Sequence, residues 1–249
     1  MKKKILFSVF SALIASSLVT GAAAEQNDFY IMRKKDNERP ALDAGLGYIT
    51  EHNGYYIGPD EKVIYLTFDA GYENGNVARI VETLDRHGAK GTFFVLENFI
   101  KRNTDLLMRM AENGHTIANH SMRHKNMTAM SKEECEAELY GLESLYKELT
   151  GKTMSKFFRP PEGKCSASLL DNVSELGYKT VFWSFAYADW DNSRQPTRDY
   201  AVKLILDNTH NGEIILLHPT SKTNADIMDT LLLEWEARGY RFGTLDELS

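Results

Sequence analysis

The chain has 249 residues, of which 43% are hydrophobic, so it can bury one sizeable core and favours a single domain. Its formal net charge of −6 at pH 7 argues against a nucleic-acid partner. The two cysteines, Cys135 and Cys165, cannot define a disulfide framework in a domain of this size, so we expect two structural thiols, with a disulfide as the alternative.

The first 24 residues have the composition of a secretory signal peptide. Lysines at positions 2–4 precede an apolar run over 5–19, and alanines at 22–24 supply the small residues of a cleavage site. A retained membrane anchor is the alternative. It is less favoured because the run is shorter than the roughly 20 residues that a membrane-spanning helix needs. Removal of residues 1–24 takes away three lysines and no acids, which changes the formal charge from −6 to −9. We therefore expect an acidic, secreted mature protein.

Residues 25–61 are polar and weakly periodic, which predicts an N-terminal extension packed on a barrel domain formed by residues 62–249. From residue 62 onward, short apolar runs alternate with amphipathic stretches, the pattern of repeated βα units. The expected strands are 63–68, 91–96, 116–119, 157–159, 180–185, 214–218 and 240–242. The expected helices are 76–87, 97–113, 132–150, 166–176, 197–210 and 224–238. The pattern predicts a single α/β domain, built as a parallel barrel or an open sheet.

Two histidines stand four residues apart in Asn119-His120-Ser121-Met122-Arg123-His124. On a helical turn, this spacing would put both imidazoles on one face, where they can bind a divalent metal. A solvated helix face or a core contact would give the same spacing. The pair therefore indicates a metalloenzyme only if other segments support it.

Four further segments place reactive side chains where predicted strands end, which is where ligands bind in a parallel barrel. They are Thr67-Phe68-Asp69-Ala70-Gly71, Arg159-Pro160-Pro161-Glu162-Gly163, Asp189-Trp190 and Leu216-Leu217-His218. With the histidine pair, these segments resemble, in order, the five motifs of the NodB-type polysaccharide deacetylases, carbohydrate esterase family 4. The longer match over residues 67–75 is similar to the PdaA-like, delta-lactam-biosynthetic branch, which acts on spore-cortex peptidoglycan. The resemblance covers about residues 30–248 and implies a distorted (β/α)7 barrel.

The resemblance also implies catalytic roles. Asp69 would be the general base, although an aspartate after a strand is also a common helix cap. His218 would be the general acid that protonates the leaving amine, with a buried structural histidine as the alternative. Asp189 would orient His218, with Asp191 as a competing candidate, and Arg159 would pair with Asp69.

For the metal, the resemblance implies two protein ligands, His120 and His124. Most of the family has a second aspartate after the catalytic one, whereas this chain has Ala70, whose methyl group cannot bind a metal. We therefore expect a weakened divalent-metal site completed by water or substrate oxygen. Zn²⁺ is the expected ion because imidazole suits it, although other transition metals are compatible.

The residues expected to contact substrate belong to the same motifs: Gly71, Tyr72, Pro160, Gly163 and Trp190. Trp183 and Tyr187 also stand near the motifs and could stack on sugars, but for Trp183 we favour the core. We expect Asn74 to cap the helix that follows it, and leave Glu73 between capping and sugar binding.

The resemblance to the PdaA-like branch implies hydrolysis of the acetamide of N-acetylmuramic acid in peptidoglycan glycan strands, as a step in muramic δ-lactam formation in spore cortex. An upstream muramoyl-alanine amidase would act on the same substrate, in the cell wall or the forespore intermembrane space. A general peptidoglycan N-acetylglucosamine or chitin-oligosaccharide deacetylase is one alternative. A catalytically degenerate glycan-binding module, marked by Ala70, is another, but a binding module would have little need for the four polar residues implied in catalysis.

Overall fold

The computed structural model describes residues 27–248, so the predicted signal peptide lies outside the described residues. The strands are β1 (Asn27–Asp28), β2 (Gly54–Tyr55), β3 (Val63–Ala70), β4 (Gly91–Val95), β5 (Thr116–Asn119), β6 (Phe157–Phe158), β7 (Lys164–Cys165), β8 (Lys179–Val181), β9 (Glu213–Leu217) and β10 (Arg241–Phe242). The α-helices are α1 (Tyr48–Glu51), α2 (Asn76–Arg86), α3 (Glu97–Arg102), α4 (Thr104–Glu112), α5 (Lys132–Thr150), α6 (Ala167–Glu175), α7 (Arg198–Asn208) and α8 (Lys222–Ala237). The 3₁₀ turns are η1 (Ala44–Leu46), η2 (Pro161–Gly163) and η3 (Leu245–Leu248). Within residues 27–248, no helix is long and apolar enough to cross a membrane.

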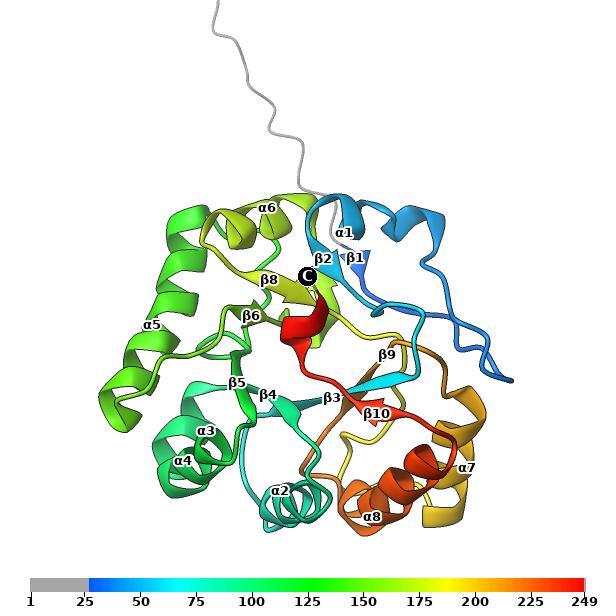
Figure 1. Cartoon of the computed structure of the whole chain (residues 1–249). Helices are drawn as coiled ribbons and strands as arrows, with labels where there is room; N and C mark the ends of the chain where they lie inside the picture. Colours follow the sequence, from blue (N-terminus) through cyan, green and yellow to red (C-terminus); the bar gives the residue numbers. More distant parts are fainter. Residues whose placement is uncertain (1–26, 249) are drawn as a thin grey trace, which may run out of the picture.

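The main sheet is parallel and curls into a distorted barrel with helices outside it (Figure 1). Around the barrel, hydrogen-bonded neighbours follow the order β9, β3, β4, β5, β6 and β8. An isolated parallel bridge between Phe185 and Ile215 joins the segment after β8 to β9. The predicted α/β barrel is confirmed.

Strand β3 shows how the barrel positions its polar residues. Alternate side chains of a strand point to opposite faces. Ile64 and Phe68 pack in the cluster beneath the helices, whereas Val63 and Tyr65 pack in the barrel interior with η3. By the same alternation, Asp69 lies on the interior face at the carboxyl end of the strand.

The predicted helix over 97–113 is wrong in one respect, because the chain forms two helices that meet at Asn103. That residue leaves the helical region, with φ −134° and ψ 37°. Its side-chain amide donates to the carbonyl of Phe99, and the Thr104 hydroxyl donates to the carbonyl of Ile100. These side chains bind the last carbonyls of α3 at the break, where the carbonyl of Phe99 also accepts the backbone N–H of Asn103.

The predicted strand over 180–185 is also too long, because regular pairing ends at Val181. The guanidinium of Arg159 binds the carbonyls of Val181 and Phe182, at 3.0 and 2.9 Å. A buried side chain thus replaces a neighbouring strand as the hydrogen-bond partner at this point. The distortion of the barrel therefore coincides with a residue of the predicted site.

Residues 27–61 lie against the barrel and also contribute to it. Phe29 and Ile49 pack in a cluster with Cys165 and Phe182. Strand β2, which sequence analysis missed, pairs in parallel with β8. The division at residues 61 and 62 stays a prediction, since a strand of the sheet lies on its N-terminal side. Both cysteines are buried and free.

Candidate active site

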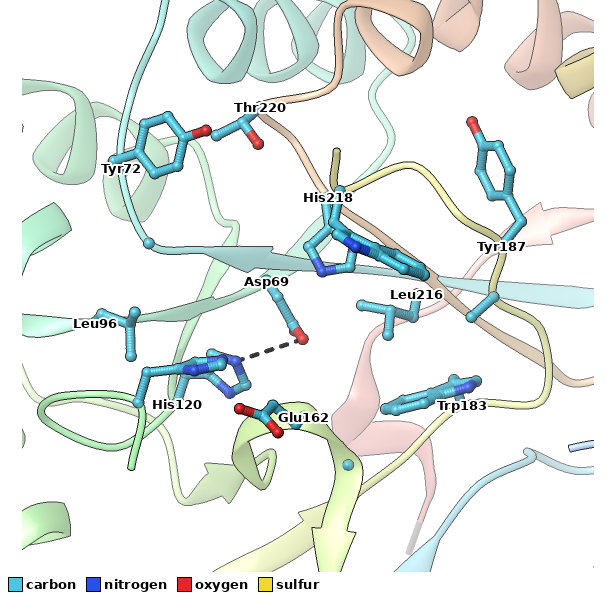
Figure 2. A pocket seen from close by; sticks show the side chains of 15 residues that line it. Asp69, Tyr72, Leu96, His120, Glu162, Trp183, Tyr187, Leu216, His218 and Thr220 are labelled. Carbon is cyan, nitrogen blue, oxygen red and sulfur yellow. Dashed lines mark ion pairs between the residues drawn. The ribbon is translucent and has the colours of Figure 1, made fainter. Parts of the chain in front are cut away.

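A cavity of about 650 Å³ opens at the carboxyl ends of the barrel strands, and residues from all five motifs line it (Figure 2). Asp69 comes from β3 and His218 follows β9. His120 follows β5 on the other side, and the carboxylate of Asp69 lies between the two imidazoles (Figure 2). The five segments are thus brought together because parallel strands end at one edge of the barrel.

Arg159 is fully buried and holds Asp69 from below. Its Nη1 donates to Asp69 Oδ1 at 2.9 Å, and its Nη2 donates to the hydroxyl of Thr67 at 2.8 Å. Its Nε and Nη2 also donate to the carbonyls of Val181, the last residue of β8, and Phe182, and the ring of Phe94 lies 4.3 Å from the guanidinium carbon. With its donors engaged in a fixed fork, this guanidinium can orient a carboxylate rigidly.

The charge of Asp69 is set by its neighbours. Burial acts to raise the pKa of this carboxyl, but its electrostatic interactions with His120, Arg159 and His218 and the hydrogen bond from Arg159 outweigh burial and hold the pKa below its ordinary value. Asp69 is therefore a carboxylate at neutral pH, and its side chain keeps 11% exposure toward the cavity.

His120 presents a bare nitrogen to Asp69. Its Nδ1 lies 2.8 Å from the carbonyl of Arg159, which can only accept, so the ring proton is on Nδ1. Burial lowers the pKa of His120 to about 4, which leaves the ring neutral. The lone pair of Nε2 then faces Asp69 Oδ2 at 3.5 Å. Two electron-rich atoms at this separation suit a cation between or beside them.

The expectation that the histidine pair lies on a helical turn is wrong. The segment after β5 is a loop in which Ser121 and His124 have φ of 67° and 56°. The Ser121 hydroxyl accepts from the backbone N–H of His124, and Glu138 of α5 accepts from that of Met122. This loop still brings the rings of His120 and His124 to 5.0 Å between centroids.

Ala70 offers the cavity no donor atom. Its methyl group is fully buried in the cluster beneath the helices and lies on the face opposite Asp69. Within residues 27–248, no three His, Cys, Asp or Glu side chains converge closely enough to hold a metal by themselves. The paired imidazoles and the adjacent carboxylate fit a divalent cation as an incomplete donor set that other ligands must complete.

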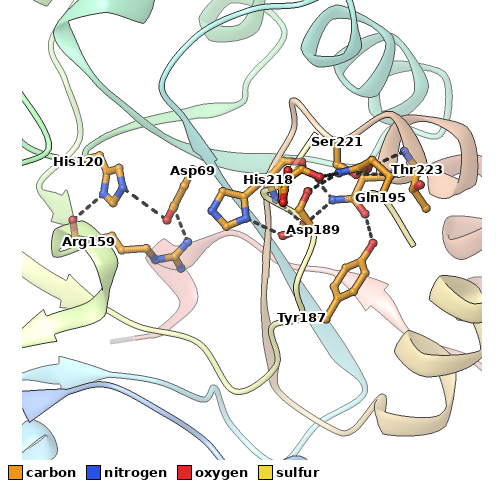
Figure 3. A network of polar contacts seen from close by, with 11 residues as sticks. Asp69, His120, Arg159, Tyr187, Asp189, Gln195, His218, Ser221 and Thr223 are labelled. Atoms are coloured by element: carbon orange, nitrogen blue, oxygen red, sulfur yellow. Dashed lines mark hydrogen bonds and ion pairs between the residues drawn. The ribbon is translucent and has the colours of Figure 1, made fainter. Parts of the chain in front are cut away.

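On the opposite wall, His218 is paired with Asp189 (Figure 3). Its Nδ1 lies 2.7 Å from Asp189 Oδ1, and its backbone N–H donates to Oδ2 at 2.8 Å. Burial acts to lower the pKa of His218, but the charge and hydrogen bond of Asp189, with the charge of Asp69, raise it above its ordinary value. Asp191, the competing candidate, is exposed and bonds to Ser193 instead.

The family model for polysaccharide deacetylases matches residues 57–181. This chain belongs to the polysaccharide deacetylase family. It is 36% identical to the peptidoglycan-N-acetylmuramic acid deacetylase PdaA of Bacillus subtilis over 96% of this chain and 94% of that protein. The solved structure of PdaA, a family 4 carbohydrate esterase, superposes with a TM-score of 0.86 at 35% identity, covering 90% of this chain and 97% of that one.

Two other proteins similar to this deacetylase differ from PdaA in their described activity. A Bacillus cereus peptidoglycan-N-acetylglucosamine deacetylase is 30% identical over 81% of this chain and 93% of its own length. A family pseudoenzyme from Bacillus anthracis is 26% identical, with a TM-score of 0.71, and the match covers 78% of this chain and 68% of that one. The family assignment makes this chain a hydrolase that acts on carbon–nitrogen bonds.

Most of the substrate-contact residues expected for the deacetylase line the cavity. Gly71, Tyr72, Gly163 and Trp190 do so, whereas Pro160 does not. Pro160 is buried, and its carbonyl accepts from the N–H of Gly163.

The aromatic residues divide between the cavity mouth and its wall. Trp190 and Tyr72 are 60% and 45% exposed. Trp183, which we expected in the core, lines the cavity while packing on Phe29 with ring centroids 5.0 Å apart. Tyr187 is buried in the wall. Among these rings of the deacetylase, Trp190 and Tyr72 are therefore the most accessible for sugar stacking.

The residues at the start of α2 cap that helix. Asn74 Oδ1 accepts from the N–H of Asn76, and Glu73 Oε1 accepts from that of Gly75 at 2.6 Å. Capping by Asn74 agrees with the expectation, and Glu73, left undecided, does the same. Its second carboxyl oxygen is buried without a hydrogen-bond partner.

Sequence reasoning missed cavity-lining Leu96, Glu162 and Thr220. Glu162 lies inside a recognised motif and has a left-handed φ of 58°, but no pattern in the sequence signals that conformation. Glu138 and Asn224 were also not predicted from the sequence, and they support the site from helices that are distant in the sequence.

Proposed function

We propose that this enzyme removes the acetyl group from N-acetylmuramic acid residues of peptidoglycan, releasing acetate and leaving a free amine. The observation that carries the proposal is the cavity in which a carboxylate fixed by Arg159 faces an imidazole fixed by Asp189, beside the histidine pair. Similarity to PdaA over nearly the whole length of both chains supports peptidoglycan as the substrate and muramic acid as the sugar.

In this mechanism Asp69 is the general base. Its carboxylate is held by Arg159 and stays charged at neutral pH, so it can take a proton from a water molecule that attacks the acetamide carbon. A divalent metal held by His120 and His124 would supply Lewis-acid polarisation of the acetamide oxygen and of that water. Trp190 and Tyr72 would hold the sugar at the rim. The backbone N–H near Gly71 would donate to the developing oxyanion.

His218 is the proposed general acid. Nδ1 is engaged by Asp189, so Nε2 is the nitrogen left for the cavity, and the side chain is 27% exposed there. The raised pKa keeps this imidazole protonated closer to neutral pH than that of a free histidine. Nε2 would give its proton to the nitrogen as the carbon–nitrogen bond breaks, so the amine leaves neutral and acetate remains.

The same proposal includes the identity of the metal, the fate of the product and the location of the enzyme. Zn²⁺ is the proposed metal, bound weakly because Ala70 supplies no ligand. The freed amine would close onto the lactyl carboxylate as the muramic δ-lactam of spore cortex, after an amidase has removed the stem peptide. A cleaved signal peptide would place the enzyme outside the cytoplasmic membrane.

Mass spectrometry of acetate loss from amidase-treated peptidoglycan tests the proposal. We expect loss from muramic acid residues with zinc-restored enzyme and little with metal-free enzyme. Loss from N-acetylglucosamine or chitin oligomers instead would favour the general deacetylase, for which the Bacillus cereus relative is the precedent. Glycan binding without acetate release under any divalent metal would favour a degenerate module, as in the Bacillus anthracis pseudoenzyme.

A further inference from the structure

Asp189 receives a hydrogen bond from a residue outside the five motifs. Asn224, fully buried in the first turn of α8, donates from its Nδ2 to Asp189 Oδ2 at 2.6 Å and to the carbonyl of His218 at 3.1 Å. The carboxylate of Asp189 therefore accepts three hydrogen bonds, two from His218 itself (Figure 3) and one from Asn224. The amide is the donor in this set that does not belong to the histidine.

Tyr187 fixes which way the amide of Asn224 points. Its hydroxyl donates to Asn224 Oδ1, and burial raises the pKa of this phenol, so it keeps its proton. With Oδ1 occupied by a donor, Nδ2 must face Asp189. The reverse orientation would set the amide oxygen against the carboxylate, two acceptors with no proton between them.

The side chain of Asn224 is not needed to begin α8. That helix is capped by the hydroxyl of Ser221, which accepts from the backbone N–H of Asn224 at 3.1 Å. Gln195 separately holds the loop by donating to the carbonyl of Asp189 at 2.8 Å. The buried amide thus spends both of its donor bonds on the pair formed by Asp189 and His218.

We propose that Asn224 is a positioning residue that fixes the orientation of Asp189 and limits the negative charge that this carboxylate presents to His218, with Tyr187 locking the amide. A carboxylate that shares its charge with another donor attracts an imidazolium less strongly. Asn224 would therefore keep His218 acidic enough to release its proton to the leaving amine. This inference rests on the proposed role of His218 as proton donor.

The variant Asn224→Ala tests the inference through two readouts. In NMR titrations, the midpoint for His218 should move to higher pH by about 0.3 to 1 unit, as expected when a carboxylate loses one hydrogen-bond donor. With restored metal, kcat should fall about three- to tenfold with KM unchanged, because a less acidic imidazole releases its proton less readily. Asp69 and Arg159 also face His218, but their mutual bond does not involve Asn224 and should be constant across the variants.

Two further variants separate positioning from general loss of structure. Asn208→Ala removes a buried amide that donates to Leu204 at the C-terminal end of α7, and it should leave both readouts unchanged. Tyr187→Phe removes only a hydroxyl and should move the midpoint in the same direction by less, with no further effect when added to Asn224→Ala. This conservative variant keeps the test available if Asn224→Ala does not fold.

An unchanged His218 midpoint in Asn224→Ala, or one moved to lower pH, would overturn the inference. Absence of turnover in the unmodified enzyme would instead count against the proposed function, because the NMR titration requires no substrate. The two failures are therefore distinguishable.

Discussion

At the scale of single residues, the proposed role of Asp69 as general base requires the negative charge of its carboxylate more than the shape of its side chain. Asn in its place would keep an oxygen for the 2.9 Å bond from Arg159 but could not accept a proton from water. We expect Asp69→Asn to lower the deacetylation rate about a thousandfold while circular dichroism stays unchanged. The matched control is Asp191→Asn, an exposed aspartate in a neighbouring loop, which should keep normal turnover. Near-normal turnover of Asp69→Asn would exclude it as the base.

His124 is the residue on which the metal proposal depends most. The loop holds its ring 5.0 Å from that of His120, and no third ligand stands at Ala70. We expect His124→Ala to lose most of its zinc affinity, measured by competition with a chelator, and its activity with it. His52→Ala, which removes an imidazole paired with Asp171 at the surface, should keep the metal. Equal zinc affinity in both variants would contradict the ligand assignment.

The sequence pattern predicted correctly that the candidate residues at strand ends lie together, because a strand end fixes where the next side chain lies. Asp69, His120 and His218 are of this kind, and all three line one cavity. Asn224 and Glu138 act from helices, through bonds to a carboxylate and to a loop backbone. Nothing in their local sequence distinguishes them from ordinary helix residues, so only the packed structure reveals them.

At the scale of elements, prediction succeeded where local signals are strong. Helix α5 begins after Ser131, whose hydroxyl forms a capping box with Glu134, and ends at Gly151 with φ 70°, matching the predicted range of 132–150. The break at Asn103 and the early end of β8 arise instead from side-chain bonds. The second of these depends on Arg159, which is distant in sequence, so periodicity could not show it.

Gly212 directly precedes β9 and is hydrogen-bonded to the segment that leads into β3. A substitution at Gly212 therefore tests how closely the two segments must pack. Its φ is +68°, and a Cβ there would lie 2.2 Å from the carbonyl oxygen of Pro59. Gly177 shares a positive φ of +83° but has open space around it. Gly177→Ala should cost about 1–2 kcal/mol through backbone strain alone. Gly212→Ala should cost at least about 1 kcal/mol more because of the overlap, a further loss of roughly 2–4 °C in Tm.

Thermal unfolding of the two glycine variants, compared with the unmodified protein, measures this difference. Equal losses of Tm in Gly212→Ala and Gly177→Ala would mean that the Pro59 segment can move away at little cost. In that case the close approach would not restrain how β9 is seated beside β3.

At the scale of the whole molecule, the two ends of the barrel differ in whether their buried carboxyl groups have a cationic partner. At the carboxyl end, Asp69 and Asp189 are each paired with a cationic or protonated partner. Near the amino end, Glu213 is fully buried at the start of β9, and within residues 27–248 no cationic side chain forms an ion pair with its carboxyl group. Burial raises the pKa of Glu213 well above its ordinary value and outweighs the opposing effects of the His210 backbone and the Thr209 side chain, so folding favours the protonated form of this carboxyl.

This carboxyl should make the stability of the whole fold depend on pH. The folded state binds a proton that the unfolded chain releases above its ordinary pKa of about 4.3, so stability is highest below that value and falls as pH rises toward the raised pKa. Glu213→Gln carries no ionisable group and should lack this dependence. Its Tm relative to the unmodified protein should therefore rise between pH 5 and pH 8, by about 2–4 °C for each kcal/mol involved. Comparing the trend with pH removes any constant cost of burying the amide, and a difference in Tm that stays flat across this range would show that Glu213 ionises equally in the folded and unfolded states.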